Sequence, residues 1–365
     1  MTTKLCRFGI LGAATIARKN WQAILNSGNA TLTAVASRSR ERAEQFIQEC
    51  QASAPFAAPP RICGYDELLA SRDVDAVYIP LPTGVRKEWV LKAAAAGKHV
   101  LCEKPCGATA AEVAEMIAAC ERANVQFMDG VMFMHSSRLP AMRKALDDGQ
   151  SVGRIRWIAS QFSFLGGEEF ARKNIRVNST LEPLGCLGDL GWYNLRFTLW
   201  AMGYQTPQRA SGRVLTAARQ AGASDVPVEF SGELHFAGGA SATFYCSFIT
   251  QNQQWAVVSG ERGALHVEDF VLPFFGSEAA FSISQPQFDV RGCQFNMNER
   301  TRRIALPEYS NNAPNSQETN LFRNFAALAL GGKPDPHWPR IALQTQQVLE
   351  ACLKSSRQDG QPVSL

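Results

Sequence analysis

The stretch that decides the fold is residues 6–17, CRFGILGAATIA, in which a buried strand runs into a small-residue loop and then a helix. The dinucleotide fingerprint G-x-G-x-x-G/A uses a first glycine for the tight turn, a second for close approach to the pyrophosphate, and a third small residue for helix packing. Here Gly12 fills the first position, while Ala14 and Ala17 fill the others. The motif is degraded and could be a plain structural turn. Its place at the first strand–helix turn favours a nucleotide site, because a helix N-terminus offers N–H groups to phosphate.

The residues that follow repeat the same alternation of strand and helix. Short apolar runs predict strands, and amphipathic stretches of helical length separate them, which is typical of a parallel sheet with crossover helices. The predicted strands are residues 6–11, 31–37, 75–81, 99–104 and 125–129, and the predicted helices are residues 16–28, 40–51, 85–97 and 108–124. We therefore expect an α/β Rossmann domain, a doubly wound parallel sheet, over residues 1–135.

After about Ser137 the pattern changes to alternation with a period of two, which indicates a mostly antiparallel sheet. The predicted strands are residues 154–164, 228–236, 241–248, 255–260 and 264–270, with a tight turn at Gly238-Gly239. Residues 277–313 are rich in Gln, Asn, Ser and Pro and are expected to form loop or ragged edge. Two helices, residues 318–332 and 341–356, close the chain, and we expect the last to pack back on the first domain. Residues 136–365 are thus predicted to form an α+β domain with a large open sheet.

Composition places the chain among ordinary globular proteins. It has 365 residues, a net charge of +4 and 45% hydrophobic residues, without a basic stripe that would suggest nucleic acid. Its ten cysteines are scattered and form no C-x-x-C pair, which favours reduced thiols over a disulfide framework or a metal site. No signal-peptide layout is evident, and no apolar run reaches the about 18 residues that span a bilayer. We expect a soluble, cytoplasmic protein.

The end of the second predicted strand bears on the cofactor. NAD-selective sites place Asp or Glu there to accept from the ribose 2′-OH. This chain has Ser37-Arg38-Ser39-Arg40-Glu41-Arg42 instead, so Ser37 and Arg38 could hold a 2′-phosphate. The alternative is a solvated helix start. The sequence favours NADP over NAD.

Two further segments carry residues suited to acid–base chemistry. Lys104, in Glu103-Lys104-Pro105, follows a predicted parallel strand, where such sheets place their ligands, although a surface loop lysine is the alternative. In residues 185–196, GCLGDLGWYNLR, a helical spacing would put Asp189, Tyr193 and Arg196 on one face. The alternative is a buried hydrogen-bonded network. A nearby ammonium would lower the pKa of a phenol, which makes Lys104 and Tyr193 a plausible pair.

Together these segments make the chain resemble the glucose–fructose oxidoreductase/inositol dehydrogenase/MocA (Gfo/Idh/MocA) family, and within it plant-type members and the dihydrodiol dehydrogenase branch. The resemblance rests on GILGAATIA, ASRSRERA, the stretch from VYIPLPT to GKHVLCEKP, MDGVMFMHSSR and GCLGDLGWYNLR, and covers nearly the whole chain. It implies a Rossmann domain, an α+β domain, and a homodimer or homotetramer formed through the second sheet. It also implies that Lys104 and Tyr193 are catalytic and that Asp189 orients the substrate or its partner.

The resemblance implies hydride transfer at the nicotinamide, with the substrate oxygen between Lys104 and the Tyr193 hydroxyl. We expect substrate contacts from Phe133, Arg176 and Trp192. The expected cofactor contacts are Gly9, Gly12, Ala13, Ala14, Thr15, Ile16, Ser37, Arg38, Arg42, Leu81, Pro82, Thr83, Arg86, Glu103 and Lys104.

Two positions depart from the family pattern. Phe133-Met134 stands where members often carry Tyr-Arg, which favours a less hydroxylated or more apolar substrate. Arg86 stands where many carry His, so an anionic group near it is possible. The expected function is an NADP(H)-dependent dehydrogenase or reductase acting on a sugar, a diol or a related small molecule. The alternatives are a non-catalytic NADP-binding sensor or partner-binding module, and an enzyme that keeps its cofactor bound through paired oxidation and reduction.

Overall fold

The computed structural model describes residues 4–220, 222 and 224–365, which fall into two compact units. The first unit comprises Met1–Ser136, Thr180–Pro183 and Tyr309–Gln346, and the second comprises Ser137–Ser179, Leu184–Glu308 and Gln347–Leu365. The first segment of the first unit ends at Ser136, one residue after the predicted boundary at residue 135. Two segments expected in the second domain, 180–183 and 309–346, belong instead to the first unit.

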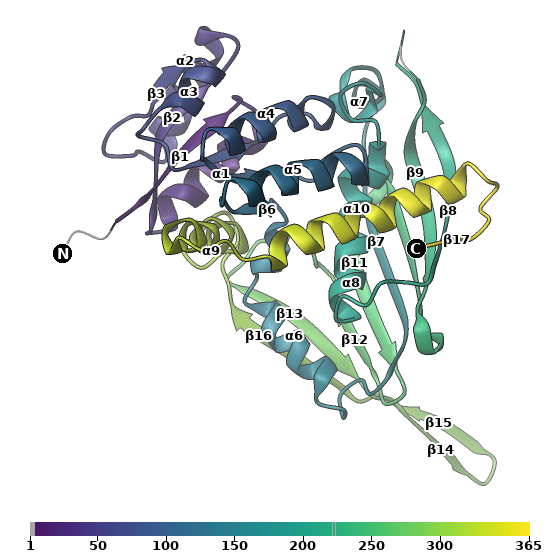
Figure 1. Cartoon of the computed structure of the whole chain (residues 1–365). Coiled ribbons are helices and arrows are strands. Elements are labelled where there is room, and N and C mark those ends of the chain that lie inside the picture. The colour runs from purple at the N-terminus through teal and green to yellow at the C-terminus, as the bar shows by residue number, and fades with distance from the viewer. Residues whose placement is uncertain (1–3, 221, 223) are drawn as a thin grey trace. The chain divides into compact units, whose positions relative to one another are not determined.

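The first unit is built on a six-stranded sheet in the order β3-β2-β1-β4-β5-β6, and all its strand pairs are parallel (Figure 1). This order is the doubly wound one, and it reverses between β1 and β4, where such sheets bind ligands at the carboxyl ends of their strands. The predicted fold class is therefore confirmed. The strands are β1 (Cys6–Leu11), β2 (Ala30–Ala36), β3 (Arg61–Cys63), β4 (Ala76–Ile79), β5 (His99–Cys102) and β6 (Phe127–Asp129).

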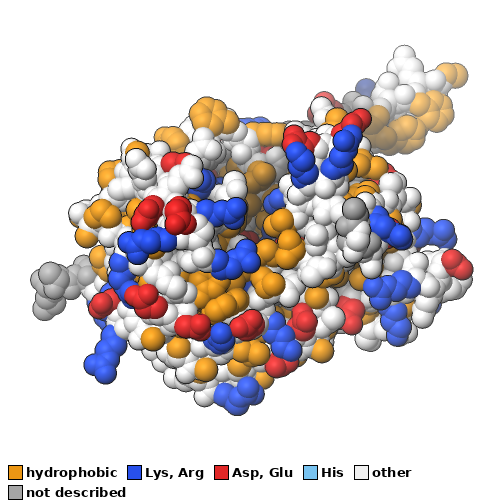
Figure 2. Space-filling view, turned by 90° about the horizontal axis from the view of Figure 1, so that it is seen from above, with side chains coloured by type: hydrophobic (Ala, Val, Ile, Leu, Met, Phe, Trp, Pro, Cys, Tyr) orange, Lys and Arg blue, Asp and Glu red, His pale blue; other side chains and the backbone are white. Residues whose placement is uncertain are grey.

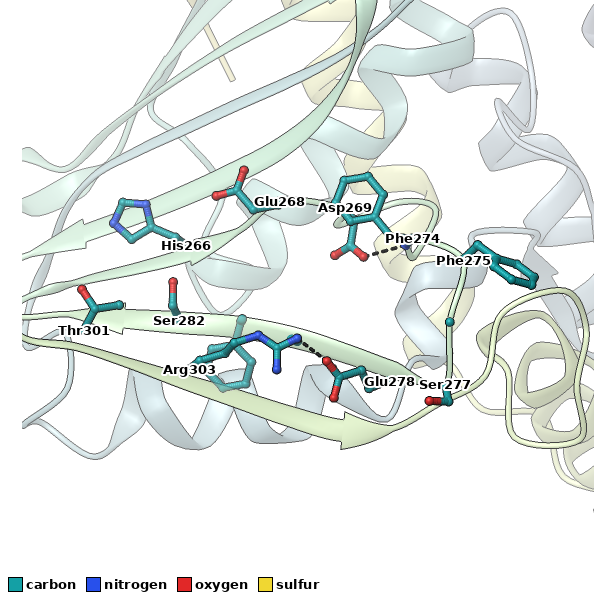
Figure 3. Close-up of a pocket in the computed structure, with 13 residues that line it drawn as sticks. His266, Glu268, Asp269, Phe274, Phe275, Ser277, Glu278, Ser282, Thr301 and Arg303 are labelled. Carbon is teal, nitrogen blue, oxygen red and sulfur yellow. Dashed lines mark hydrogen bonds and ion pairs between the residues drawn. The ribbon is translucent and has the colours of Figure 1, made fainter.

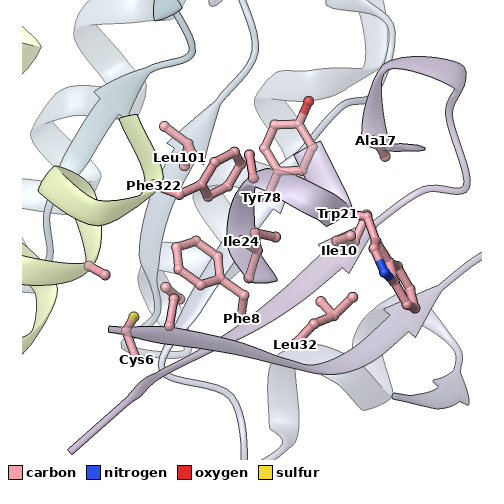
Figure 4. Close-up of a cluster of buried hydrophobic side chains, with 14 of the residues drawn as sticks. Cys6, Phe8, Ile10, Ala17, Trp21, Ile24, Leu32, Tyr78, Leu101 and Phe322 are labelled. Atoms are coloured by element: carbon pink, nitrogen blue, oxygen red, sulfur yellow. The ribbon is translucent and has the colours of Figure 1, made fainter. Parts of the chain in front are cut away.

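Helices connect these strands, and four of them, α1, α2, α4 and α5, match the predicted ones, whereas α3 was not predicted. One helix from the far end of the chain completes the core. These helices are α1 (Thr15–Asn26), α2 (Arg40–Ser53), α3 (Tyr65–Ala70), α4 (Thr83–Ala95), α5 (Ala110–Arg122), the short 3₁₀ turn η1 (Met132–His135) and α9 (Gln317–Gly331). Phe322 of α9 lies among Phe8, Tyr78 and Ile24 in the buried cluster (Figure 4). Its ring centroid is 5.5 Å from that of Phe8 and 5.7 Å from that of Tyr78.

The last helix, α10 (His337–Ser356), is shared between the two units. Its residues as far as Gln346 belong to the first unit, and the rest belong to the second. Trp338, near its start, packs against the buried cluster of the first unit. The apolar face of α9, with Leu321, Phe322, Phe325 and Ala326, supplies the fully buried part of this packing. The sequence shows two amphipathic helices but does not show which sheet each of them covers.

The second unit is built on a nine-stranded sheet in the order β16-β13-β12-β11-β7-β10-β9-β8-β17. Only β7 and β10 pair in parallel, so the prediction of a mostly antiparallel sheet is confirmed. Gly238 and Gly239, with φ of 79° and 85°, make the predicted turn between β9 and β10 within η4 (Ala237–Gly239). The strands are β7 (Ile155–Leu165), β8 (Arg209–Ala218), β9 (Val226–His235), β10 (Ser241–Ser247), β11 (Ile249–Gly260), β12 (Ala264–Val267), β13 (Glu278–Ser284), β16 (Thr301–Pro307) and β17 (Val363–Ser364).

Residues 277–313 were predicted to form loop or ragged edge. The prediction of loop was wrong for most of this segment, whereas β16 does form an edge of the large sheet, with β13 beside it. Besides β13 and β16, this segment forms a separate hairpin of β14 (Gln287–Arg291) and β15 (Gln294–Asn298). In β13, EAAFSIS, every second residue is buried, but Ala and Ser occupy so many positions that the alternation is weak. In β14 and β15, the alternation is difficult to recognise because Gln and Asn occupy several positions.

Helices of the second unit lie against its sheet. They are α6 (Arg138–Asp147), α7 (Glu168–Lys173), η2 (Ile175–Val177), the π-helical turn η3 (Leu187–Gly191) and α8 (Trp192–Ala201). α8 packs on β7 and β10, and α6 packs on β13. In the described parts of the chain, no helix combines the length and the apolar character needed to cross a membrane. All ten cysteines are free thiols, as predicted, and nine of them are buried.

Candidate functional site

The loop after β1 has the conformation that a phosphate-binding turn requires. Gly12 has φ of 119°, and a Cβ built on it would lie 3.0 Å from Leu81 Cδ2, so both backbone and space favour glycine. α1 then starts with Ala14 as N-cap, without a side-chain capping bond and without an acidic residue in its first turn. Thr15 and Ile16 are exposed there. The first-turn N–H groups and the helix dipole therefore suit a diphosphate, and the residues fit a dinucleotide.

Gly9 has a different structural role from the predicted one. A Cβ at Gly9 would lie 2.7 Å from Leu68 Cδ2, so this glycine lets α3 pack closely on β1. It is a buried packing position inside the strand, whereas we predicted a cofactor contact.

The end of β2 leads into an arginine-rich helix start. Ser39 caps α2 by accepting from the Arg42 N–H at 3.2 Å, and its own N–H donates to Ser37 Oγ at 3.3 Å. The side chains of Arg38 and Arg42 are exposed. This edge of the sheet therefore presents hydroxyl and guanidinium groups where an NAD site has a carboxylate.

Tyr65, at the start of α3, belongs to the same corner and was not predicted from the sequence. Its hydroxyl lies 3.7 Å from the position of a Cβ on Gly12. Burial raises the pKa of Tyr65, while the charge of nearby Arg38 acts in the opposite direction. Its position just after the end of a strand could have indicated it, but that strand, β3, has three residues and is too short to recognise by periodicity.

Arg86, on α4, holds the ends of two central strands. It is 3% exposed; its Nε donates to the Leu81 carbonyl at 3.0 Å and its Nη1 to the Glu103 carbonyl at 2.8 Å. The guanidinium also donates to the Pro105 carbonyl. An anionic group near Arg86 was considered from the sequence. The structure instead places these donors on backbone carbonyls, so Arg86 positions the chain on both sides of Lys104.

Glu103 is held from the side of α1. The Tyr78 hydroxyl donates to Glu103 Oε1 at 2.6 Å, and Asn20 Nδ2 donates to the Tyr78 oxygen at 2.6 Å. Burial, with the nearby charge of Glu103, raises the pKa of Tyr78 well above its ordinary value, so the phenol stays protonated and donates. A Cβ on Gly130 would lie 3.2 Å from the carboxyl group of Glu103. Any side chain larger than that of glycine at residue 130 would therefore press on this carboxyl group.

Lys104 itself follows β5 at the carboxyl edge of the sheet. It is partly exposed, its N–H donates to Glu103 Oε2 at 3.3 Å, and the Lys104–Pro105 peptide bond is cis. Arg86 thus holds the backbone carbonyls on both sides of Lys104, and the Glu103 carboxylate holds its N–H. A lysine held in this way can present its ammonium group reproducibly to a ligand.

The N-terminus of α4 is occupied by a segment from later in the chain. Glu182 accepts from the Thr83 N–H at 3.1 Å and from the Thr83 hydroxyl at 2.6 Å. The Gly84 N–H donates to the Leu181 carbonyl at 2.9 Å. Thr83, expected to contact the cofactor, is 1% exposed and engaged by this carboxylate. Leu81 is buried beside Gly12, and Pro82 is the N-cap residue of α4.

In the second unit, the predicted catalytic helix begins as a π-helical turn, η3, before α8. The α-helical spacing assumed for Asp189, Tyr193 and Arg196 therefore does not hold across the segment. Asp189 Oδ2 accepts from Arg176 Nε at 2.7 Å, which brings together two of the predicted site residues. Tyr193 is 5% exposed, and its ring packs edge-on against Phe162 with centroids 5.5 Å apart.

Three other residues of interest are buried. Arg196 is fully buried, with its guanidinium carbon 5.9 Å from the centre of the Trp192 ring. Phe133 and Trp192, both expected to contact the substrate, are 2% and 0% exposed. Of the three predicted substrate residues, Arg176 alone is partly exposed. Lys104 and the phosphate loop belong to the first unit, whereas Asp189, Tyr193 and Arg176 belong to the second.

Comparisons with known proteins find matches for both the N-terminal and the C-terminal part of the chain. Residues 6–131 match the model of the oxidoreductase family with an NAD-binding Rossmann fold, GFO_IDH_MocA, and residues 140–266 match the GFO/IDH/MocA C-terminal domain. A dTDP-3,4-didehydro-2,6-dideoxy-alpha-D-glucose 3-reductase from Saccharopolyspora spinosa is 32% identical over 74% of this chain and 76% of that protein.

Two further relatives cover a similar share. D-xylose 1-dehydrogenase (NADP(+)) 2 from Haloferax volcanii is 33% identical over 71% of this chain and 74% of its own length. The trans-1,2-dihydrobenzene-1,2-diol dehydrogenase of Mus musculus is 32% identical over 73% and 76%. Among solved structures, the 3-ketoreductase KijD10 from Actinomadura kijaniata, in complex with NADP and TDP-benzene, has a TM-score of 0.78 at 23% identity, covering 96% of this chain and 98% of that one. This last likeness is one of fold.

Proposed function

Because the chain belongs to the Gfo/Idh/MocA oxidoreductase family, we propose that it transfers hydride between NADP(H) and a carbonyl or alcohol carbon of a sugar, a diol or a related small molecule. One observation supports this most: Lys104 lies at the carboxyl end of β5, close to the point where the strand order reverses, with its backbone fixed by Arg86 and Glu103. Ligands of doubly wound sheets bind at that edge.

NADP is the cofactor that the residues fit best. The loop from Gly12 to Ile16 would hold the diphosphate, and Ser37 and Arg38 would hold the 2′-phosphate, with Arg42 close in sequence. A carboxylate at the end of β2 would repel that phosphate, and none stands there. The named NADP(+) dependence of the Haloferax volcanii relative supports the same choice. When bound, the nicotinamide supplies or accepts the hydride.

The chain's own residues would move the proton and place the substrate. We assign Lys104 to polarise the substrate oxygen and Tyr193 to donate its hydroxyl proton during reduction, with the reverse during oxidation. Asp189 would act through Arg176, because their ion pair fixes both side chains beside the segment that carries Tyr193.

Two features narrow the substrate class. Phe133-Met134 supplies no polar group where the family pattern often has Tyr-Arg, which favours a substrate with fewer hydroxyl groups than a full sugar. Relatives named as a dideoxysugar-nucleotide reductase and a diol dehydrogenase fit that choice.

The ten free thiols fit a reducing compartment and support a cytoplasmic location.

Kinetics of four proteins test this proposal: wild type, Lys104→Met, Tyr193→Phe and the double variant, assayed with NADPH on a panel of keto-sugars, aldoses and diols. We expect each single change to lower kcat/KM by at least 100-fold. The double variant should lose little more than the worse single variant, because groups acting on one oxygen are not additive. Lys92→Met and Tyr309→Phe, at an exposed lysine and a half-exposed tyrosine, are matched controls. Full activity in Lys104→Met or Tyr193→Phe contradicts the proposal, and tight NADPH binding without turnover on any substrate favours a non-catalytic sensor.

A further inference from the structure

The side chain of Tyr65 reaches the turn that follows β1. Its hydroxyl oxygen lies 3.7 Å from the position of a Cβ on Gly12, and the Gly12 N–H donates at 2.9 Å to the carbonyl of Ala36, the last residue of β2. Tyr65 itself follows β3, which is the edge strand beside β2 in the parallel sheet. The tyrosine therefore extends across the carboxyl end of β2 toward the loop after β1.

Neighbouring groups hold the ring of Tyr65 in this position. It packs edge-on against the ring of Trp89 in α4, with the centroids 4.7 Å apart and the planes at 83°. The backbone before it is fixed as well, because the Leu68 N–H donates to the carbonyl of Gly64, the N-cap residue of α3, at 3.0 Å. In the part of the chain that the structure describes, the hydroxyl group has no hydrogen-bond partner. It is thus held in place by packing and keeps its O–H for a ligand.

The guanidinium group of Arg38 lies close to this hydroxyl. Burial raises the pKa of Tyr65, and the charge of Arg38 acts in the opposite direction. The phenol therefore stays protonated at neutral pH and can donate a hydrogen bond. Arg38 is exposed, and among the described residues no carboxylate pairs with it, whereas Arg40 pairs with Glu44. The corner thus combines an O–H donor with a cation that no carboxylate neutralises.

Positive side chains alone do not mark an anion site in this protein. Figure 2 shows Lys and Arg side chains interspersed with Asp and Glu over one face of the molecule. The cavity of 660 Å³ over β12, β13 and β16 has an arginine, Arg303, but this arginine is paired with Glu278 (Figure 3). Glu268 and Asp269 also line that cavity, so its charge does not favour an anion. The corner beside the turn after β1 is better suited to a phosphate group.

The position of the Tyr65 hydroxyl indicates which part of a dinucleotide it can contact. In a doubly wound sheet the diphosphate lies at the turn after β1, and the adenosine ribose lies at the end of β2. The hydroxyl lies near Gly12, which begins that turn, and near Arg38, which follows β2. A ribose placed there directs its 2′ substituent toward Arg38. That substituent is a phosphate group in NADP and a hydroxyl group in NAD.

We propose that Tyr65 is a specificity-determining residue for NADP, and that its hydroxyl donates a hydrogen bond to the 2′-phosphate held by Arg38. This inference rests on the proposed function, since it requires an NADP site in the first unit. A hydrogen bond to a charged phosphate oxygen is stronger than one to the neutral 2′-hydroxyl of NAD. Tyr65 therefore adds to the preference for NADP that Ser37 and Arg38 provide.

Direct binding of nucleotides to the full chain tests this inference without any substrate. Tyr65→Phe keeps the ring against Trp89 and removes only the hydroxyl. We expect it to raise the dissociation constants of NADPH and of the fragment 2′,5′-ADP by about tenfold or more in calorimetry. Those of NADH and ADP, which lack the 2′-phosphate, should stay within about twofold. Tyr309→Phe, at an exposed tyrosine of the first unit, is the matched control and should change none of them.

Two further measurements separate this role from a structural one. The melting temperature of the nucleotide-free protein should be the same in wild type and Tyr65→Phe, because the change breaks no hydrogen bond between described residues. Phosphorus NMR of bound NADP⁺ should show that Tyr65→Phe shifts the resonance of the 2′-phosphate and leaves the two diphosphate resonances in place.

Equal weakening of NADPH and NADH in Tyr65→Phe, or a shift confined to the diphosphate resonances, would place the hydroxyl on another part of the cofactor and overturn the inference. Wild-type affinity for NADPH in Tyr65→Phe would overturn it as well and leave the proposed function standing. A wild-type protein that binds neither NADPH nor NADH would contradict the proposed function together with this inference.

Discussion

The hydroxyl group of Tyr78 joins two elements of the first unit, because it accepts from Asn20 of α1 and donates to the carboxylate of Glu103. The other oxygen of that carboxylate accepts from the Lys104 N–H. Tyr78, which lies in the buried strand β4, therefore acts on Lys104 through Glu103.

Replacing Tyr78 by Phe tests this buried network. The change removes a donor to a buried carboxylate, so we expect the free energy of unfolding to fall by about 1–3 kcal/mol. We also expect kcat to fall while the NADPH dissociation constant stays within about threefold, because Glu103 positions Lys104. Urea unfolding and steady-state kinetics measure the two effects. Tyr309→Phe, at a residue 52% exposed, should change neither, and equal behaviour of both variants would show that the Tyr78 hydroxyl has no special role.

Arg38 is the residue on which the choice of cofactor depends. Arg38→Ala should raise the KM for NADPH at least tenfold and leave the KM for NADH nearly unchanged, because only NADPH carries the 2′-phosphate. Arg40→Ala is the matched control, since Arg40 is exposed and pairs with Glu44. If Arg38→Ala weakens both cofactors equally, the residue does not read the phosphate.

At the scale of elements, periodicity predicts the strands and helices of the first unit to within a few residues, because each has a strong apolar pattern. It misses β3, which has three residues at a sheet edge, and the six-residue helix α3 that follows it. In the second unit it misses α6, β8 and β13 to β16, and the exposed faces of β13 to β16 are rich in Ser, Gln, Asn and Arg. The π-helical turn before α8 is also invisible, since a sequence that suits an α-helix suits such a turn equally. Tertiary packing decides these cases.

The docking of residues 180–183 on α4 depends on one small residue. A Cβ on Gly84 would lie 2.0 Å from the Thr180 carbonyl oxygen. Gly84→Ala should therefore push the segment away and lower the free energy of unfolding by about 1–3 kcal/mol. Gly331→Ala, where a Cβ meets nothing within 4 Å at the end of α9, should be neutral or slightly stabilising. Denaturant titrations of both variants decide the matter, and equal stability of the two would refute the close approach.

The free energy of unfolding of the protein is expected to depend on pH through His99, the first residue of β5. His99 Nδ1 accepts from the Gln126 N–H at 2.9 Å, and burial lowers the pKa of His99 below the ordinary 6.5, with Asp75 opposing this. The unfolded chain therefore takes up the proton more readily. The stabilisation is complete above pH 6.5 and is lost as the pH falls through the lowered pKa of the folded state.

This prediction can be checked by urea midpoints between pH 7.5 and 5. We expect the wild-type midpoint to fall with pH, and the fall to be smaller in His99→Gln, which has no proton to gain there. Gln126 also exchanges two hydrogen bonds with Asp335 in the segment before α10. An identical pH dependence in both proteins would show that His99 does not contribute.

At the scale of the whole molecule, the two units are not two consecutive stretches of chain. Residues 309–346 return to complete the core of the first unit, and residues 180–183 dock on α4. The class of each unit follows from local patterns, but the return of distant segments does not, because it is decided by which apolar faces remain to be covered. For the same reason the sequence groups Lys104, Asp189 and Tyr193 by resemblance, whereas the structure adds Tyr78 and Glu182 by contact. It also shows that Arg86, expected to contact the cofactor, donates to backbone carbonyls.

Isotope transfer from the cofactor shows whether hydride reaches a substrate carbon with Lys104 and Tyr193 acting on its oxygen. The chain would be incubated with each stereoisomer of 4-deuterated NADPH and the carbonyl substrates of the panel, and the products examined by mass spectrometry and NMR. We predict that one stereoisomer delivers deuterium to the former carbonyl carbon, and that Lys104→Met and Tyr193→Phe bind NADPH but transfer at least 100-fold more slowly. Wild-type protein that binds NADPH and labels no substrate, or variants that transfer at the wild-type rate, would contradict the account.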